Sequence, residues 1–185
     1  AVSSISLDYL KRLILPTNVI IADPGGMVVS YESGYALLAL RQKDWTNEKT
    51  LVAAVLNQMV NLQNADGSWY QQYYPYKNFS RYEDRKVDSG AAMMAWAMAD
   101  YDARNASITY KTAFRKAADF LYSLRWELAS YYEDGVLRYK CLLKNQVING
   151  VKEDVAFAAD VAEAILALIR GLQAYGDPLT TDPGG

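Results

Sequence analysis

Three acidic residues stand where apolar, helix-like segments begin, and they are the side chains of this chain best suited to chemistry. Glu32 and Asp88 each precede a Ser-Gly pair, and Asp154 follows another acidic residue. Two carboxyl groups whose pKa values are pushed apart supply a proton donor and a base, which is what hydrolysis of a glycosidic bond requires. The alternative is structural, because an acidic residue at the start of a helix caps free N–H groups and suits the helix dipole. Glu32, Asp88 and Asp154 are therefore candidate catalytic residues, with helix capping as the alternative for each.

A tyrosine-rich segment between Trp69 and Asp88 is the second candidate site. It has about 18 residues, six of them Tyr or Phe, and we expect it to be a long loop. Aromatic faces beside amide and charged groups suit a sugar ring, whose C–H face stacks while its hydroxyls form hydrogen bonds. Packing of the tyrosines onto the helix ends is the equally weighted alternative. The candidate ring contacts in this loop are Tyr70, Tyr73, Tyr74 and Tyr76.

Composition excludes several classes of function. Histidine is absent and Cys141 is the only cysteine, which removes histidine-dependent nucleophiles, histidine metal sites, thiolate zinc clusters and internal disulfides. The net charge of −2 gives no reason to expect nucleic acid as a partner, and no apolar run is long enough to span a membrane. No phosphate-binding loop or EF-hand spacing occurs. We therefore expect no cofactor and no metal ion.

Around these residues the sequence repeats an order of elements. Each unit has an acidic opening, an apolar helix, a short loop, an amphipathic helix and a turn. The openings at Glu32, Asp88 and Asp154 are followed by segments that are apolar nearly all round, which predicts buried inner helices, the last running from Asp154 to about Tyr175. If these helices lie side by side, the three acids share one rim.

Helical spacing also predicts amphipathic partner helices outside the inner ones. One apolar stripe runs from Leu51 to Leu62, another from Phe114 to Leu128, and a short one includes Leu10 and Leu13. Turns are expected at Asp23-Pro24-Gly25-Gly26, Asp66-Gly67 and Asp134-Gly135. The sequence thus predicts about six helices, no long strand, one domain over residues 1–175 and a linker-like tail over 176–185.

The segment Gln63-Asn64-Ala65-Asp66-Gly67-Ser68-Trp69, between an amphipathic helix and Asp88-Ser89-Gly90, resembles the repeats of the six-hairpin glycosidase-like (α/α) toroids. The resemblance extends from about Met27 to Tyr175. It implies carbohydrate hydrolysis by two carboxyl groups, with Asp88 as acid or base, Glu32 or Asp154 as the second group, and Trp69, Tyr70, Tyr73 and Trp96 lining subsites. A complete toroid has six hairpins, whereas this chain has about three.

The expected fold is therefore an all-α array of about three antiparallel helical hairpins, a partial (α/α) toroid. The expected function is that of an extracellular or cell-surface, glycoside hydrolase-like protein acting on a polysaccharide. Two sequons, at Asn78 and Asn105, favour that location because both fall in predicted loops. The alternatives are a non-catalytic glycan-binding module and a structural assembly protein. A further domain or self-association would complete the helical ring.

Overall fold

The computed structural model describes residues 4–22, 26–41 and 45–176 and contains six helices, as the sequence predicts. The turn predicted around Asp23-Pro24-Gly25 and the tail after Gly176 lie outside the described residues. The helices are α1 (Ser4–Arg12), α2 (Ser30–Leu40), α3 (Trp45–Asn61), α4 (Asp88–Asn105), α5 (Lys111–Ser123) and α6 (Ala158–Tyr175). No described helix is long and apolar enough to cross a membrane.

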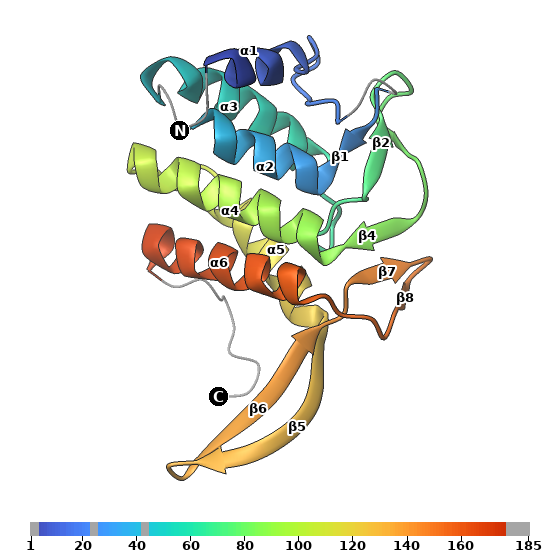
Figure 1. Cartoon of the computed structure of the whole chain (residues 1–185), viewed down its shortest axis with the longest axis vertical. Helices are drawn as coiled ribbons and strands as arrows, with labels where there is room; N and C mark the ends of the chain where they lie inside the picture. The colour runs from blue at the N-terminus through green and yellow to red at the C-terminus, as the bar shows by residue number, and fades with distance from the viewer. Residues whose placement is uncertain (1–3, 23–25, 42–44, 177–185) are drawn as a thin grey trace.

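The inner helices α2, α4 and α6 lie side by side, with α4 packed against both of the others. Figure 1 shows the three running in the same direction, with their first turns all on the side of the short strands that precede them. Helix α4 is buried almost all round, and Met93, Met94 and Met98 are inaccessible to solvent. Small residues permit the close approach of α2 and α4, since a Cβ added at Gly34 would lie 2.6 Å from the Cβ of Met93. The three acidic openings thus belong to one end of a row of parallel helices.

The outer helices α3 and α5 cover the inner row through the amphipathic faces that the sequence predicts. Helix α3 buries Val52, Val55, Leu56 and Met59, and α5 buries Phe114, Ala117 and Leu121 among others. The stripe predicted through Leu128 is too long, because α5 ends at Ser123 and Leu128 lies in a strand. Asn105 is the last residue of α4 rather than a loop residue.

The structure also contains β-strands, so the expected all-α fold class is only partly right. Two small antiparallel sheets lie beside the starts of the inner helices, with strand orders β1-β2-β3 and β4-β7-β8. Their strands are β1 (Val28–Val29), β2 (Gln72–Tyr74), β3 (Ser80–Arg81), β4 (Arg85–Val87), β7 (Gln146–Ile148) and β8 (Val151–Lys152). The tyrosine-rich segment is therefore not a long structureless loop, since it supplies β2, β3 and β4.

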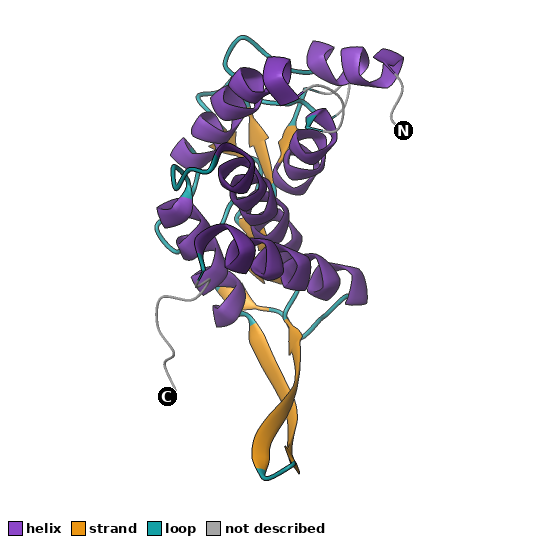
Figure 2. Cartoon of the chain, turned by 90° about the vertical axis from the view of Figure 1, so that its left-hand side faces the viewer, coloured by secondary structure: helices purple, strands orange, loops and turns teal. Residues whose placement is uncertain are grey.

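A longer hairpin, β5 (Arg125–Glu133) with β6 (Val136–Leu143), extends away from the helices in both views (Figures 1 and 2). The prediction of no long strand is wrong here, and the reason is the Asp134-Gly135 turn. Both residues have positive φ angles, 53° and 77°, as a two-residue hairpin turn requires. The Asp-Gly signal was assigned to the end of an outer helix, but it joins two strands.

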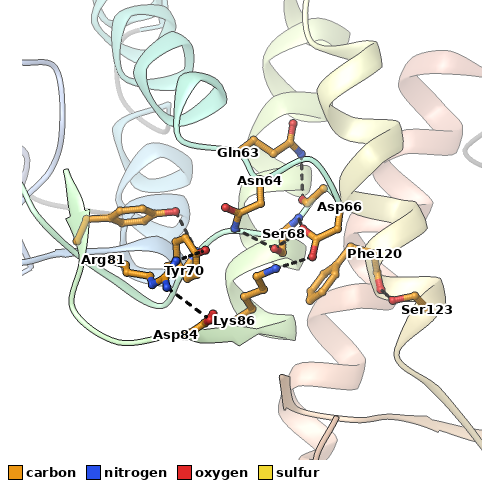
Figure 3. A network of polar contacts seen from close by, with 12 residues as sticks. Gln63, Asn64, Asp66, Ser68, Tyr70, Arg81, Asp84, Lys86, Phe120 and Ser123 are labelled. Carbon is orange, nitrogen blue, oxygen red and sulfur yellow. Dashed lines mark hydrogen bonds and ion pairs between the residues drawn. The ribbon is translucent and has the colours of Figure 1, made fainter. Parts of the chain in front are cut away.

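The other Asp-Gly turn, at Asp66-Gly67, ties α3 to α5 (Figure 3). The Asp66 carboxylate accepts hydrogen bonds from the N–H and hydroxyl groups of Ser68, and the Gln63 amide donates to the carbonyl groups of Gly67 and Ala113. Gly67 has a φ of +87°, and a Cβ added to it would lie 1.8 Å from the carbonyl oxygen of Lys116. No side chain fits this turn without displacing the α5 backbone.

Gly67→Ala is expected to lower the free energy of unfolding by about 3 kcal/mol or more, because backbone strain at positive φ adds to the clash with α5. Gly135→Ala is the matched control, because Gly135 also has a positive φ but its added Cβ would have nothing within 4 Å. That variant should lose only about 1–2 kcal/mol. Urea unfolding of both variants measures the difference, and equal losses would contradict the close contact between this turn and α5.

Candidate active site

The pairing of two short strands positions the first turn of α4. Strand β4 pairs with β7, so that Val87 lies opposite Gln146, and the N–H group of Asp88 donates to the carbonyl oxygen of Asn145 at 2.9 Å. The N–H group of Asn145 in turn donates to the carbonyl oxygen of Val155, in the segment that leads into α6. Asn145 therefore lies where the starts of α4 and α6 meet.

Asp88 is completely buried at this junction. Its Oδ1 accepts hydrogen bonds from the N–H group of Ser89 at 2.7 Å and from the side-chain amide of Asn145 at 3.2 Å. Its Oδ2 is also buried, and no described N–H or hydroxyl group donates a hydrogen bond to it. Burial, and secondly the negative charge of Asp160, raise the pKa of Asp88 to about 8. A proton therefore remains on this carboxyl group at neutral pH.

Asp88 is not the N-cap of α4, which was the structural alternative. The helix begins at Asp88 itself, and the N-cap position falls on Val87, which has no side-chain hydrogen bond to offer. The carboxyl group does accept the N–H group of Ser89, so part of the expected interaction with the helix start is present.

Asp160, in the first turn of α6, is the acidic partner of Asp88. The amide of Asn145 donates to Asp160 Oδ2 at 2.6 Å while also donating to Asp88, so one amide group holds both carboxyl groups. Two neighbouring carboxyl groups are difficult to ionise together, because each negative charge disfavours the other. The charge of Asp160 therefore favours the protonated form of Asp88, and the site places a proton donor beside a second carboxyl group.

Glu163 and Tyr35 extend the cluster towards solvent. Glu163 lies one turn beyond Asp160 on α6 and accepts a hydrogen bond from the hydroxyl group of Tyr35 on α2. That bond is the main cause that raises the pKa of Tyr35 to about 12, and burial raises the pKa of Glu163. Tyr35 is 47% exposed, and Asp160 and Glu163 are half-buried. A ligand in solvent would therefore meet these three side chains first, with Asp88 behind them.

The other two acids of the predicted set lie in different surroundings. Glu32 is in the first turn of α2, where it accepts a hydrogen bond from Tyr31. Asp154 precedes α6, because that helix begins at Ala158 and not at Asp154 as predicted. Its side chain is 69% exposed and forms an ion pair with Lys144. Of the three acids, Asp88 is the one that shares a hydrogen-bond donor with a second carboxyl group.

The predicted aromatic contacts divide into buried and exposed side chains. Trp69 is inaccessible, and its indole N–H donates to the carbonyl oxygen of Met59 at 2.6 Å. Tyr73 is also buried, and Trp96 lies half-buried against the core in the middle of α4. The buried rings of Trp69 and Tyr73 therefore present no free face to a sugar.

The other tyrosines of this segment are exposed (Tyr76 and Tyr82) or half-buried (Tyr70 and Tyr74), and we call these four the tyrosine ridge. Tyr76 and Tyr82 are 75% and 55% exposed, and Tyr74 and Tyr82 pack edge to face at 5.7 Å. Arg81 donates to the hydroxyl group of Tyr70 at 2.8 Å and pairs with Asp84 (Figure 3). The ridge therefore combines ring faces with charged hydrogen-bonding groups.

The site contains four residues that were not predicted from the sequence: Asp160, Glu163, Asn145 and Tyr35. The start of α6 was assigned four residues too early, so the acid at the helix opening was taken to be Asp154. The i, i+3 spacing of Asp160 and Glu163 on a helix is a readable signal once the boundary is correct. Asn145 carried no local signal, because it reaches Asp88 through the pairing of β4 with β7. Within the described residues, no group of three or more His, Cys, Asp and Glu side chains is arranged to hold a metal ion.

Comparison with known proteins finds similarity at the level of structure. No protein-family model matches the sequence, and no curated protein matches it. A GH8 endo-β-1,4-glucanase from an Achatina fulica gut metagenomic library matches with a TM-score of 0.54 and 16% identity, covering 70% of this chain and 40% of that one. A polysaccharide lyase matches with a TM-score of 0.58 and 15% identity, covering 92% of this chain and 53% of that one.

The chain thus spans about half the length of these solved structures, or less. At such low identity the likeness concerns the fold alone. The resemblance to six-hairpin (α/α) toroids is confirmed at the level of the fold. In the described part of the chain, that fold consists of the inner helices α2, α4 and α6 with the outer helices α3 and α5 packed on them.

Proposed function

We propose that the chain cleaves glycosidic bonds of a polysaccharide at the carboxyl cluster, with Asp88 as the proton donor. The observation that carries the proposal is that Asp88 is buried beside Asp160 and has its pKa raised to about 8. A general acid must hold its proton at the working pH and release it to the leaving oxygen, and the raised pKa of Asp88 meets the first of these requirements.

Asp160 is proposed as the second carboxyl group of the pair. Its negative charge is one cause of the raised pKa of Asp88, and it lies nearer to solvent. In hydrolysis of a glycosidic bond, the second carboxylate either activates water or attacks the sugar directly. Asn145 holds the pair in position, and Glu163 with Tyr35 offers a hydrogen-bonding edge to sugar hydroxyls. The chemistry needs no cofactor and no metal ion.

The solved structures with this fold support a carbohydrate substrate, since one is an endo-β-1,4-glucanase and the other a polysaccharide lyase. We also propose an extracellular or cell-surface location. The sequon at Asn78, an exposed turn residue, agrees with that location.

The experiment that tests the function is incubation of the purified chain with a panel of neutral and acidic polysaccharides. Release of reducing ends measures any cleavage, and ultraviolet absorbance of unsaturated products separates elimination from hydrolysis. We expect release from at least one polymer, without unsaturated product. Binding without any release would contradict the catalytic proposal and favour a glycan-binding module, for which the tyrosine ridge is the specific support.

Replacing both Tyr76 and Tyr82 by Ala is expected to weaken polysaccharide binding about tenfold or more, because each ring offers an exposed stacking face and about 1.4 kcal/mol corresponds to tenfold. Tyr132→Ala is the matched control, since Tyr132 is 75% exposed next to the tip of the β5–β6 hairpin. Affinity electrophoresis in polymer-containing gels measures the change. Equal retardation of the double variant and wild type would remove the ridge from binding.

A further inference from the structure

Helix α6 carries an apolar surface that faces away from the rest of the described chain. Three of its residues are buried, namely Ala164, Ala167 and Gly171. Its exposed large side chains are Ile165, Leu166, Ile169 and Leu172, each 45–52% exposed. The full exposed row within the helix is Ala158, Ala159, Ala162, Ile165, Leu166, Ile169, Leu172 and Gln173.

The spacing of this row is that of a helix-packing face. Steps of three and four residues along the row place its members on one side of the helix. The row contains no charged residue, and Phe157, 54% exposed, extends it beyond the first turn. Soluble monomers rarely leave so contiguous an apolar surface open to water. The face is therefore suited to a second helix and not to solvent.

Helix α2, at the other end of the inner row, offers no comparable apolar surface. In α2, Tyr35 is the one exposed residue, and its hydroxyl group is engaged with Glu163. A second copy therefore finds no apolar face on α2 against which to place its α6. In a dimer with a two-fold axis between two copies of α6, each copy buries its exposed apolar face against the same face of the other.

The row is complementary to itself when reversed. If the two-fold axis passes between Ile165 and Leu166, then residue i of one copy lies opposite residue 331 − i of the other. Ala159 then meets Leu172, Ala162 meets Ile169, and Ile165 meets Leu166. Every exposed residue of α6 is thus paired with another exposed residue. Ala159 and Ala162 lie opposite the larger Leu172 and Ile169, and the branched side chains of Ile165 and Leu166 meet at the axis. The antiparallel arrangement also aligns the two helix dipoles favourably.

We propose that the chain forms a homodimer in solution through antiparallel contact of its two α6 helices. This inference is independent of the proposed catalysis, because the exposed row is a different face of α6 from the one that carries Asp160 and Glu163. A contact limited to one helix per copy is smaller than the roughly 800 Å² per partner of a standard interface. The dimer is therefore a weak one, with a dissociation constant on the order of micromolar.

Sedimentation velocity of the full chain over a concentration series tests the dimer. Wild type is expected to shift from monomer to dimer across roughly 1–100 µM, whereas Ile165→Glu and Ile169→Glu should remain monomeric because each would bury a charge in the contact. Both positions are exposed in the single chain, so folding is retained. Ile108→Glu is the matched control, since Ile108 is 70% exposed outside α6, and it should dimerise like wild type.

Cysteine cross-linking tests the direction of the contact, in a Cys141→Ser background that leaves the engineered thiol as the sole one. A mixture of Ala162→Cys and Ile169→Cys chains is expected to form the mixed disulfide readily. Ala162→Cys alone should cross-link poorly, because its two copies would be offset by about 10 Å along the axis at 1.5 Å per residue.

Three outcomes would overturn the proposal. The first is a monomer at every concentration. The second is a dimer that the two Glu variants leave intact. The third is efficient cross-linking of Ala162→Cys with itself, which indicates a parallel contact.

Discussion

Asp88→Asn is expected to lower the rate of polysaccharide cleavage by about 10²–10⁴-fold while leaving polymer binding within a few-fold of wild type. The substitution keeps the size of the side chain and an oxygen that accepts the Ser89 N–H, but removes the proton that the proposed acid must donate. Reducing-end release by wild type and variant, on the polymer that wild type cleaves best, measures the loss.

Asp119→Asn is the matched control for that experiment, because Asp119 is an exposed residue of α5. It should cleave at the wild-type rate. Cleavage by Asp88→Asn at more than a tenth of that rate would exclude Asp88 as the proton donor. Asp160→Asn provides a second discrimination. The substitution removes a charge that raises the pKa of Asp88. In the pH–rate profile of this variant, the fall in activity on the alkaline side should therefore begin at a lower pH than in wild type.

The second large effect concerns stability, because a carboxyl group with a raised pKa makes folding depend on pH. The pKa of Asp88 rises from an ordinary 3.8 to about 8 in the folded chain, so the folded state binds this proton more tightly than the unfolded state. The resulting stability is fully present below about pH 4 and is lost as the pH rises towards 8. Each pKa unit corresponds to about 1.4 kcal/mol, so the loss is on the order of several kcal/mol.

Urea unfolding of wild type and Asp88→Asn between pH 4 and pH 9 measures this effect. The Asn side chain has no proton to lose, so the variant should be the more stable protein at pH 8 and 9. The gap between the two proteins should close as the pH falls towards 4. A constant gap across the whole range would mean that Asp88 does not titrate differently in the folded and unfolded chains.

The helical part of the fold could be predicted because its signals are local. Apolar periodicity gave six helices and separated inner from outer ones, and the Asp66-Gly67 turn agrees with the positive φ of Gly67. The strands could not be predicted with the same rules. The Asp134-Gly135 turn carries the same dipeptide as Asp66-Gly67, and only its partners in space show that it joins β5 to β6.

The candidate site could be predicted only as far as Asp88. The environment of Asp88 depends on its burial by β4, β7 and α6. It also depends on Asn145, which is 57 residues away in sequence and donates hydrogen bonds to both Asp88 and Asp160. Contacts across such a distance in sequence leave no local pattern. For Trp69 the local pattern was misleading. An aromatic residue in a turn suggested a sugar contact, but the indole N–H donates a hydrogen bond to the carbonyl oxygen of Met59 inside the core.

Asp88 is expected to keep a proton at neutral pH because it is buried beside Asp160. A pH titration of the side-chain carboxyl carbon of Asp88 by NMR, in ¹³C-labelled protein and assigned with Asp88→Asn, measures this directly. The account predicts a titration midpoint at about pH 8 in wild type and a lower midpoint in Asp160→Asn. A wild-type midpoint near 4, the ordinary value for an aspartic acid, would contradict it.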